Sequence, residues 1–230
     1  MMKKLYAVAM AALLFAVSCS KDEENPTPSA PQARIMFAHT TISVDTIRIL
    51  VNDTPLVGTA VIPYAGNTGY VAMNPGSKKI AFTLANNLPL TDTTVNLSAD
   101  QAYSMFSTGT VINVQKMIIQ DDLSAPKAGH AKVRFVNMSV DTFSYNAFVG
   151  AGDTAELGTN IMHKGFTGFS EFVAGSYNLQ MERVKDSGPA DIVQIPNYQL
   201  ASGKIYTILL SGSMTVQGAG ERSAKVILHN

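Results

Sequence analysis

Apolar and polar residues alternate in short runs along most of the chain. In residues 46–51, 79–84 and 177–182, an apolar side chain stands at every second position. A period of two buries one face of a strand and leaves the other face in water. Turn signals such as Asn74-Pro75-Gly76 separate the runs. The pattern predicts an all-β body made of short antiparallel strands, arranged as a β-sandwich.

The pattern occurs twice, with an offset that varies between 96 and 103 residues. Ala33–His39 aligns with Ala131–Asn137, and Val44-Asp45-Thr46 aligns with Val140-Asp141-Thr142. Each unit has about 100 residues, which is the size of a domain. We therefore expect one domain in residues 33–122, a linker in 123–129 and a second domain in 130–230.

A tyrosine stands at the same place in both units. Tyr103 follows Leu97 by six residues, and Tyr206 follows Leu200 by six. This spacing resembles the tyrosine corner of immunoglobulin-like and fibronectin type III sandwiches, where the phenol hydroxyl bonds to backbone a few residues upstream. The predicted fold is two tandem immunoglobulin-like or fibronectin type III-like antiparallel β-sandwiches.

The first residues of the chain predict an export signal. Lys3 and Lys4 precede an uncharged apolar run of 13 residues, Leu5 to Val17. Such a run is shorter than the roughly 20 residues of a membrane-spanning helix and has the length of a signal-peptide core. Ala16-Val17-Ser18 and then Cys19 resemble a bacterial lipobox. We expect a signal peptide in residues 1–18 and lipidation at Cys19, so that acyl chains tie the protein to a membrane.

The segment after Cys19 is charged and then rich in proline. Lys21, Asp22, Glu23 and Glu24 resemble the surface-export signal of lipoproteins in the Bacteroidetes group. We expect residues 19–32 to be a tether and the protein to be an outer-membrane lipoprotein exposed on the cell surface. The alternative is a charged tether without a sorting role, on a protein that faces the periplasm.

The repeated features resemble a bacterial envelope family catalogued as domain of unknown function 4397. The resemblance rests on the opening strand with His39, on Asp45, on the Pro75-Gly76-Ser77 hairpin and on the spacing before Tyr103. It spans residues 33–122 and 130–230, although the second unit has Asn137 in place of the histidine. The resemblance implies a β-sandwich outside the cell envelope and no known activity.

Composition and motifs favour a protein that is not an enzyme. Lys and Arg balance Asp and Glu at 17 each, so nothing indicates nucleic-acid binding. A single cysteine excludes a disulfide framework. The four histidines lack metal-ligand spacing, and no nucleophile elbow or phosphate loop occurs, so we expect no metal, cofactor or catalytic residue. A hydrolase whose carboxylates meet only in space stays the alternative. Asp121 and Asp122 are interpreted as solvated charges.

Three Asp-Thr pairs resemble the acceptor motif of Bacteroidetes protein O-glycosylation. The candidate acceptors are Thr46, Thr93 and Thr154. Asp-Thr is also an ordinary pair at turns and strand edges. Glycosylation there would record passage through the periplasm and would not define a function.

Four aromatic residues flank corresponding loops of the two units. Tyr64 and Tyr70 surround Gly66–Gly69, and Phe166 and Phe169 surround Thr167-Gly168. Loops of a sandwich commonly carry recognition, so these side chains are candidates for a paired recognition edge. Packing beneath the loops is the alternative.

These observations predict a lipid-anchored envelope protein that acts as an adhesion, scaffold or binding module. Its expected partners are the membrane and an extracellular glycan or protein. One alternative is an accessory glycan-binding lipoprotein of a polysaccharide-uptake system. Another is a fimbrial or assembly subunit that donates a strand. The apolar run 224–228 near the end of the chain is expected to close the second sandwich instead.

Overall fold

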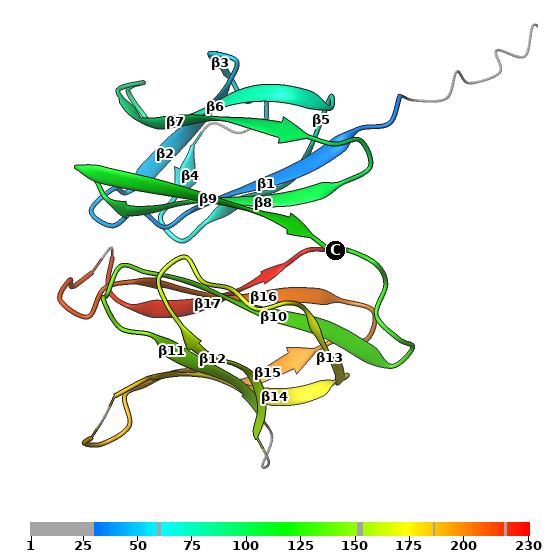
Figure 1. Cartoon of the computed structure of the whole chain (residues 1–230), viewed down its shortest axis with the longest axis vertical. Coiled ribbons are helices and arrows are strands. Elements are labelled where there is room, and N and C mark those ends of the chain that lie inside the picture. Colours follow the sequence, from blue (N-terminus) through cyan, green and yellow to red (C-terminus); the bar gives the residue numbers. More distant parts are fainter. Residues whose placement is uncertain (1–29, 59–60, 151–153, 186, 219) are drawn as a thin grey trace, which may run out of the picture. The chain divides into compact units, whose positions relative to one another are not determined.

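Strands make up all the regular structure in the described part of the chain (Figure 1). The computed structural model describes residues 30–58, 61–150, 154–185, 187–218 and 220–230. Contacts group residues Pro31–Asn230 into one compact unit. The all-β prediction is confirmed.

The first half of this unit contains nine strands in two sheets. Within the described residues, no helix occurs between them. The strands are β1 (Ala33–His39), β2 (Thr46–Val51), β3 (Thr54–Pro55), β4 (Ile62–Pro63), β5 (Asn67–Met73), β6 (Gly76–Leu84), β7 (Pro89–Leu97), β8 (Ala102–Thr110) and β9 (Asn113–Asp121). One sheet has the order β5-β1-β8-β9, and the other has the order β3-β2-β6-β7 with β4 beside β2.

The described residues of the second half form eight strands, also in two sheets. Its strands are β10 (His130–Ser139), β11 (Tyr145–Gly150), β12 (Thr154–Ile161), β13 (Ser170–Val173), β14 (Gly175–Arg183), β15 (Ile192–Leu200), β16 (Ile205–Gly212) and β17 (Ser223–Leu228). The orders are β13-β10-β16-β17 and β12-β11-β14-β15. Each position matches a strand of the first half, so the topology repeats. The run 224–228 closes the second half as predicted, because β17 pairs with β16.

The expected arrangement of strands is wrong in one respect. β1 pairs with β8 in parallel, and β10 pairs with β16 in parallel, so two of the four sheets are mixed. β1 and β2 also lie in different sheets, whereas the first two strands of an immunoglobulin sheet are neighbours. Alternation of side chains reports which face a residue occupies and contains no information on strand direction.

The two tyrosines make the hydrogen bonds that their spacing predicts. The Tyr103 hydroxyl accepts a bond of 3.1 Å from the backbone N–H of Ser98, and the Tyr206 hydroxyl accepts one of 3.1 Å from Ala201. Each bond spans five residues and fixes the turn that leads into β8 or β16. The prediction of this local structure is confirmed in both halves.

His39 in the first unit and Asn137 in the second form equivalent hydrogen bonds. His39 Nδ1 accepts a bond from the N–H of Thr41, and Asn137 Oδ1 accepts one from the N–H of Ser139. The other end of each side chain bonds to a backbone carbonyl oxygen, Val44 for His39 and Ile161 for Asn137. Asparagine therefore replaces histidine without loss of either bond. His39 is fully buried.

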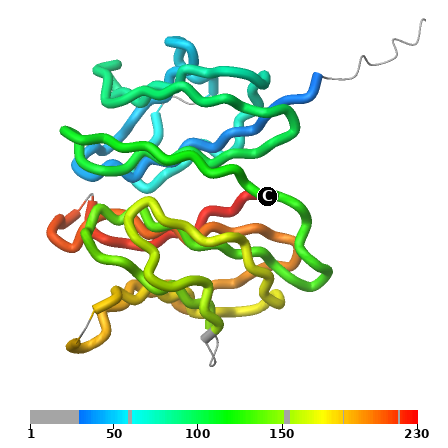
Figure 2. Tube along the Cα trace, in the orientation of Figure 1, coloured from blue at the N-terminus to red at the C-terminus, as the bar shows by residue number. Residues whose placement is uncertain are grey.

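Three apolar clusters lie between the four sheets. The first fills the space between the two sheets of the first half, with Phe37 and Phe82 near its centre. The second does the same in the second half around Phe135 and Met181. The third cluster joins the halves. The sheets therefore form a stack of four layers, which Figure 2 shows as paired traces within the described unit.

Because of the third cluster, the inner strands are buried on both faces. On β1, Ile35 and Phe37 face the first cluster, while Met36 and Ala38 face the third. Every residue of β16 is buried, and β8 is buried except for its last residue. The sequence pattern does not predict that these strands are buried on both faces, since the pattern of one half does not reveal that a second half covers it.

The division into two domains stays a prediction. The strands do separate into two pairs of sheets on either side of residues 122–129. Residues Pro31–Asn230 nevertheless form a single compact unit, with the third cluster continuous between the pairs.

The glycine at the end of β16 provides a test of the close packing around the turn that follows this strand. Gly212 has φ of 90°, and a Cβ atom there would overlap the Glu221 carbonyl oxygen. We expect Gly212→Ala to destabilise the protein by about 3 kcal/mol, from positive φ and from the clash. Gly203→Ala is the matched control, because Gly203 has φ of 80° and open space around the Cβ position. The control should cost only about 1 kcal/mol in urea unfolding. Equal losses would contradict the close approach.

Candidate interface site between the two halves

An apolar patch between the halves surrounds a buried polar group. The third cluster includes Met36 and Phe106 from the first half and Met138 and Leu209 from the second. Residues of the two inner sheets supply all its buried members, which makes it a contact between sheet faces.

A buried ion pair crosses this contact. Arg134 on β10 places its Nη2 atom 2.7 Å from Oδ1 of Asp121, at the end of β9. The Arg134 side chain is 2% exposed and the Asp121 side chain is 0% exposed. Ser104 on β8 donates to Oδ2 of Asp121 at 2.7 Å, and Arg134 Nη2 donates to the Ser104 hydroxyl at 3.2 Å. The interpretation of Asp121 as a solvated charge is wrong, because the second half covers it.

Further hydrogen bonds close a ring around the ion pair. Arg134 Nε donates to Thr207 Oγ1 at 2.8 Å, and Thr207 Oγ1 lies 2.7 Å from His229 Nε2. His229 Nδ1 lies 2.8 Å from the Tyr70 hydroxyl, which donates to Asp121 Oδ2 at 2.6 Å. We call this set the interface ring; its members are Tyr70, Ser104, Asp121, Arg134, Thr207 and His229.

One assignment of protons agrees with all the hydrogen bonds of the interface ring. Tyr70 has a single hydroxyl proton and gives it to Asp121, so its oxygen accepts from His229 Nδ1–H. His229 Nε2 is then the acceptor for the Thr207 hydroxyl, whose oxygen accepts from Arg134. This arrangement requires a neutral His229 with its proton on Nδ1. A protonated imidazole would have two N–H groups and could not accept from Thr207.

Burial supports the neutral form of His229. Burial lowers the pKa of His229 to about 4, and the positive charge of Arg134 lowers it further, against the opposite effect of Asp121. Burial and the Asp121 carboxylate raise the pKa of Tyr70. Both groups are therefore neutral at pH 7, as the proton assignment requires.

Aromatic side chains pack over charged groups in the interface ring and beside it. The guanidinium of Arg134 lies 4.6 Å from the centre of the Phe169 ring, and Phe169 meets His229 edge to face at 5.8 Å. Arg34 lies over Tyr70 at 5.8 Å. Contacts between cations and ring faces stabilise partly desolvated charges.

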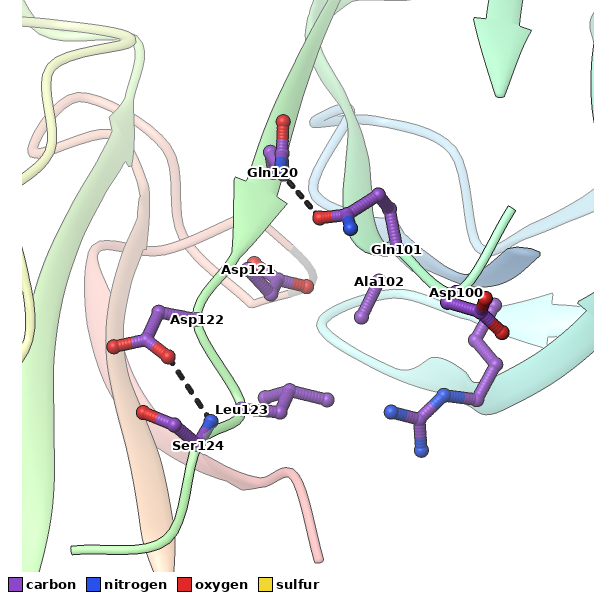
Figure 3. A pocket seen from close by; sticks show the side chains of 9 residues that line it. Asp100, Gln101, Ala102, Gln120, Asp121, Asp122, Leu123 and Ser124 are labelled. Atoms are coloured by element: carbon purple, nitrogen blue, oxygen red, sulfur yellow. Dashed lines mark hydrogen bonds between the residues drawn. The ribbon is translucent and has the colours of Figure 1, made fainter. Parts of the chain in front are cut away.

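A polar pocket of about 500 Å³ lies beside the interface ring and shares Asp121 with it (Figure 3). Its other lining residues come from the start of β1, the turn before β8 with the first residue of that strand, the end of β9 and the segment after it. They are Arg34, Asp100, Gln101, Ala102, Gln120, Asp122, Leu123 and Ser124. Asp122 binds Lys132 Nζ at 2.9 Å. The pKa of Asp122 falls to about 2, because Ser124 and Lys132 donate hydrogen bonds to it.

The four aromatic residues proposed for recognition have different surroundings. Tyr70 belongs to the interface ring, and Phe169 packs against Arg134 and His229 of that ring. Tyr64 contacts His39 edge to face at 5.8 Å. Phe166 is exposed. The structure does not bring the four together on one edge, and a recognition role for them stays a prediction.

The other candidate residues are at the surface or outside the described part. Thr46 begins β2 and is half-buried, and Thr93 is half-buried in the edge strand β7. Thr154 begins β12, but its side chain lies outside the described residues. Cys19, Lys21, Asp22, Glu23 and Glu24 also lie outside them. Within the described residues, no group of three His, Cys, Asp or Glu side chains could hold a metal ion, and no helix could span a membrane.

Sequence reasoning missed the interface ring. Its members are separated by up to 159 residues, as for Tyr70 and His229. Arg134 stands between Val133 and Phe135, where period two places a solvent-facing residue. One signal was present: Val136 and Met138 continue the face of Arg134 and are apolar. An apolar continuation on the outer face indicates that something covers that face.

Comparisons with known proteins give one family model over part of the chain and several solved structures, among them the following two. Residues 33–144 match the family model "Domain of unknown function (DUF4397)", which covers the first half and β10. No curated protein matches the chain. A crystal structure from Bacteroides uniformis named "putative cell adhesion protein" is 9% identical, with a TM-score of 0.29, covering 89% of this chain and 100% of that one. The tip fimbrial protein Mfa3 of Porphyromonas gingivalis is 9% identical, with a TM-score of 0.26, covering 86% and 99%. Likeness at these TM-scores carries no conclusion for this chain.

Removing one partner of the buried ion pair should be costly. We expect Arg134→Ala to destabilise the protein by about 3–5 kcal/mol, since it leaves the Asp121 carboxylate buried and unpaired. Lys79→Ala removes an exposed pair with Asp53, which water screens, and should have a much smaller effect. Urea unfolding measures both. If the two losses are alike, the ion pair between the halves is not formed in solution.

Stability should fall in mild acid because of the buried histidines. Burial lowers the pKa of both His39 and His229 from 6.5 to about 4. Between pH 6.5 and pH 4 the unfolded chain therefore binds protons at these histidines, whereas the folded protein does not. Stability is complete above pH 6.5 and is lost as the pH falls toward 4, by roughly 2–3 kcal/mol for each histidine. Urea unfolding between pH 7 and pH 4.5 measures the slope. His229→Gln should flatten it, and an unchanged slope would contradict the neutral His229.

Proposed function

We propose that this protein is a lipid-anchored module of the bacterial cell surface that supports adhesion or scaffolding and is not an enzyme. Cys19 attaches it to the outer membrane, and residues Lys21 to Glu24 direct it outward. The sequence of the first 24 residues supports both the lipid anchor at Cys19 and export to the cell surface. The geometry of residues 31–230 supports the role.

One observation supports a role in adhesion or scaffolding: loops of both halves lie together at the end of the stack of sheets that is away from Pro31. β1 and β10 both run toward this end, and Thr108 of β8 bonds the carbonyl oxygen of Met138 on β10 at 3.1 Å. Ile42 of the first half lies against Gly220 of the second. We call this surface the far end; it contains residues 40–45, 85–88, 111–112, 140–144, 184–185, 187–191, 213–218 and 220–222.

The far end also exposes apolar side chains. Ile112, in the two-residue turn between β8 and β9, is 93% exposed, and its neighbour Val111 and Leu88 of the loop between β6 and β7 are also exposed. Gly, Asn and Asp are the usual residues of such turns. Apolar residues exposed at a tip are suited to contact with another surface. An anchor at Cys19 and contacts at the far end would let the stack of sheets act as a spacer.

We also propose that residues 33–122 and 130–230 are two copies of one domain. The repeated strand order supports it, as do the equivalent bonds of Tyr103 and Tyr206 and of His39 and Asn137. The second copy then belongs to the same family as residues 33–144 match.

Protease treatment of intact cells tests whether the protein is exposed on the cell surface. We expect the wild-type protein to be cleaved from the surface, because the tether carries the export signal. A variant with Lys21→Ala, Asp22→Ala and Glu23→Ala should stay protected until the outer membrane is opened. Immunoblots of treated and lysed cells give the result. Protection of the wild type would overturn surface exposure, and cleavage of both proteins would overturn the role of the charged residues.

A further inference from the structure

The polar pocket beside the interface ring contains a cation and an anion that have no protein partner. Within the described residues, no hydrogen bond or ion pair involves the Arg34 guanidinium, which contacts only the face of Tyr70. The Asp100 carboxylate likewise has no partner there. The remaining charges of the lining are neutralised, Asp121 by Arg134 and Asp122 by Lys132.

Hydrogen bonds fix the backbone of these two residues. The N–H of Arg34 bonds to the carbonyl oxygen of Gln101 at 2.9 Å, and the N–H of Asp100 bonds to that of Gln32 at 3.0 Å. Asp100 has φ of 60° at a tight turn. Stacking on Tyr70, whose hydroxyl is bound to Asp121, also orients Arg34. A site held in this way needs little ordering when a ligand binds.

Two amides complete the polar surface. Gln120 Nε2 donates to Gln101 Oε1 at 2.6 Å, which leaves Gln120 Oε1 and Gln101 Nε2 for a ligand. In Figure 3 the two amides face each other, with Asp122 and Ser124 on one side of the pocket and Asp100 on the other. Paired donors and acceptors of this kind fit neighbouring hydroxyl groups.

We propose that this pocket binds an acidic saccharide, with the carboxylate of a hexuronic acid on Arg34 and ring hydroxyls on Asp100, Gln101 and Gln120. The guanidinium matches a carboxylate in a two-bond geometry. A phosphate ester fits less well, because its second negative charge would meet the Asp100 carboxylate, while Arg34 is the one cation of the described lining that is not already paired with an aspartate. The volume of about 500 Å³ lies within the range of small-molecule sites.

Titration of the purified protein with galacturonic-acid and galactose oligomers of equal length tests the proposal. We expect the acidic oligomer to bind at least about tenfold more tightly, because only it offers a carboxylate to Arg34. Arg34→Gln should remove this preference and leave the weak binding of the neutral oligomer. Asp100→Asn should weaken both oligomers and keep the preference. Asparagine tolerates positive φ, so the turn should persist.

Two control variants separate the pocket from general effects. Asp53→Asn changes another exposed aspartate at positive φ, and Arg48→Gln changes an arginine on β2 outside the pocket. Both should bind as the wild type does. Unfolding curves confirm that each variant folds.

The proposal fails if neither oligomer binds, if Arg34→Gln binds the acidic oligomer as tightly as the wild type, or if a free amino acid binds more tightly than either oligomer. This inference does not rest on the proposed function. Binding is measured in solution, so a protein that proves to face the periplasm could still bind the acidic oligomer. A surface-exposed protein could equally fail to bind it.

Discussion

The buried ion pair between Arg134 and Asp121 is the constraint on which the arrangement of the four sheets depends. A guanidinium and a carboxylate removed from water are strongly unfavourable unless each has its partner and its remaining bonds. Here the partners come from different halves of the chain, at 2.7 Å. Neither inner sheet could bury its own charge without the other sheet in this position. The pair therefore ties the fold of each half to its contact with the other.

The apolar cluster around the ion pair stabilises the contact between the two inner sheets. The hydrogen bonds of the interface ring fix the position of one sheet relative to the other. Side chains such as Met36, Phe106 and Leu209 would tolerate small displacements between the sheets. Hydrogen bonds do not, because donor and acceptor must meet within a few tenths of an ångström. A shift of the second half by one residue along β10 would move Arg134 by about 3.3 Å and break its contacts with Asp121 and Ser104. Buried polar groups are thus better explained here by specificity than by added stability.

The sequence predicts local structure well and contacts between distant segments poorly. The six-residue spacing before Tyr103 and Tyr206 is local, and it correctly predicts the bonds to Ser98 and Ala201. The parallel pairing of β1 with β8 joins residues about 68 positions apart, and no turn signal specifies it. Arg134 looks like a surface residue because period two describes one strand and one face. Its burial depends on the second layer, which the pattern of a single strand cannot contain.

The interface ring also shapes the pocket next to it. Tyr70 uses its hydroxyl in the ring and its face to hold Arg34, so one residue connects the contact between the halves to the wall of the pocket. Asp121 belongs to both and is neutralised only by Arg134 of the second half. In a first half without its neighbour, Asp121 would be an unpaired acid at the edge of the pocket, and Tyr70 would lose its bond to His229. The charge balance that favours a single carboxylate on the ligand therefore requires both halves, although most of the lining comes from the first half and the segment after it.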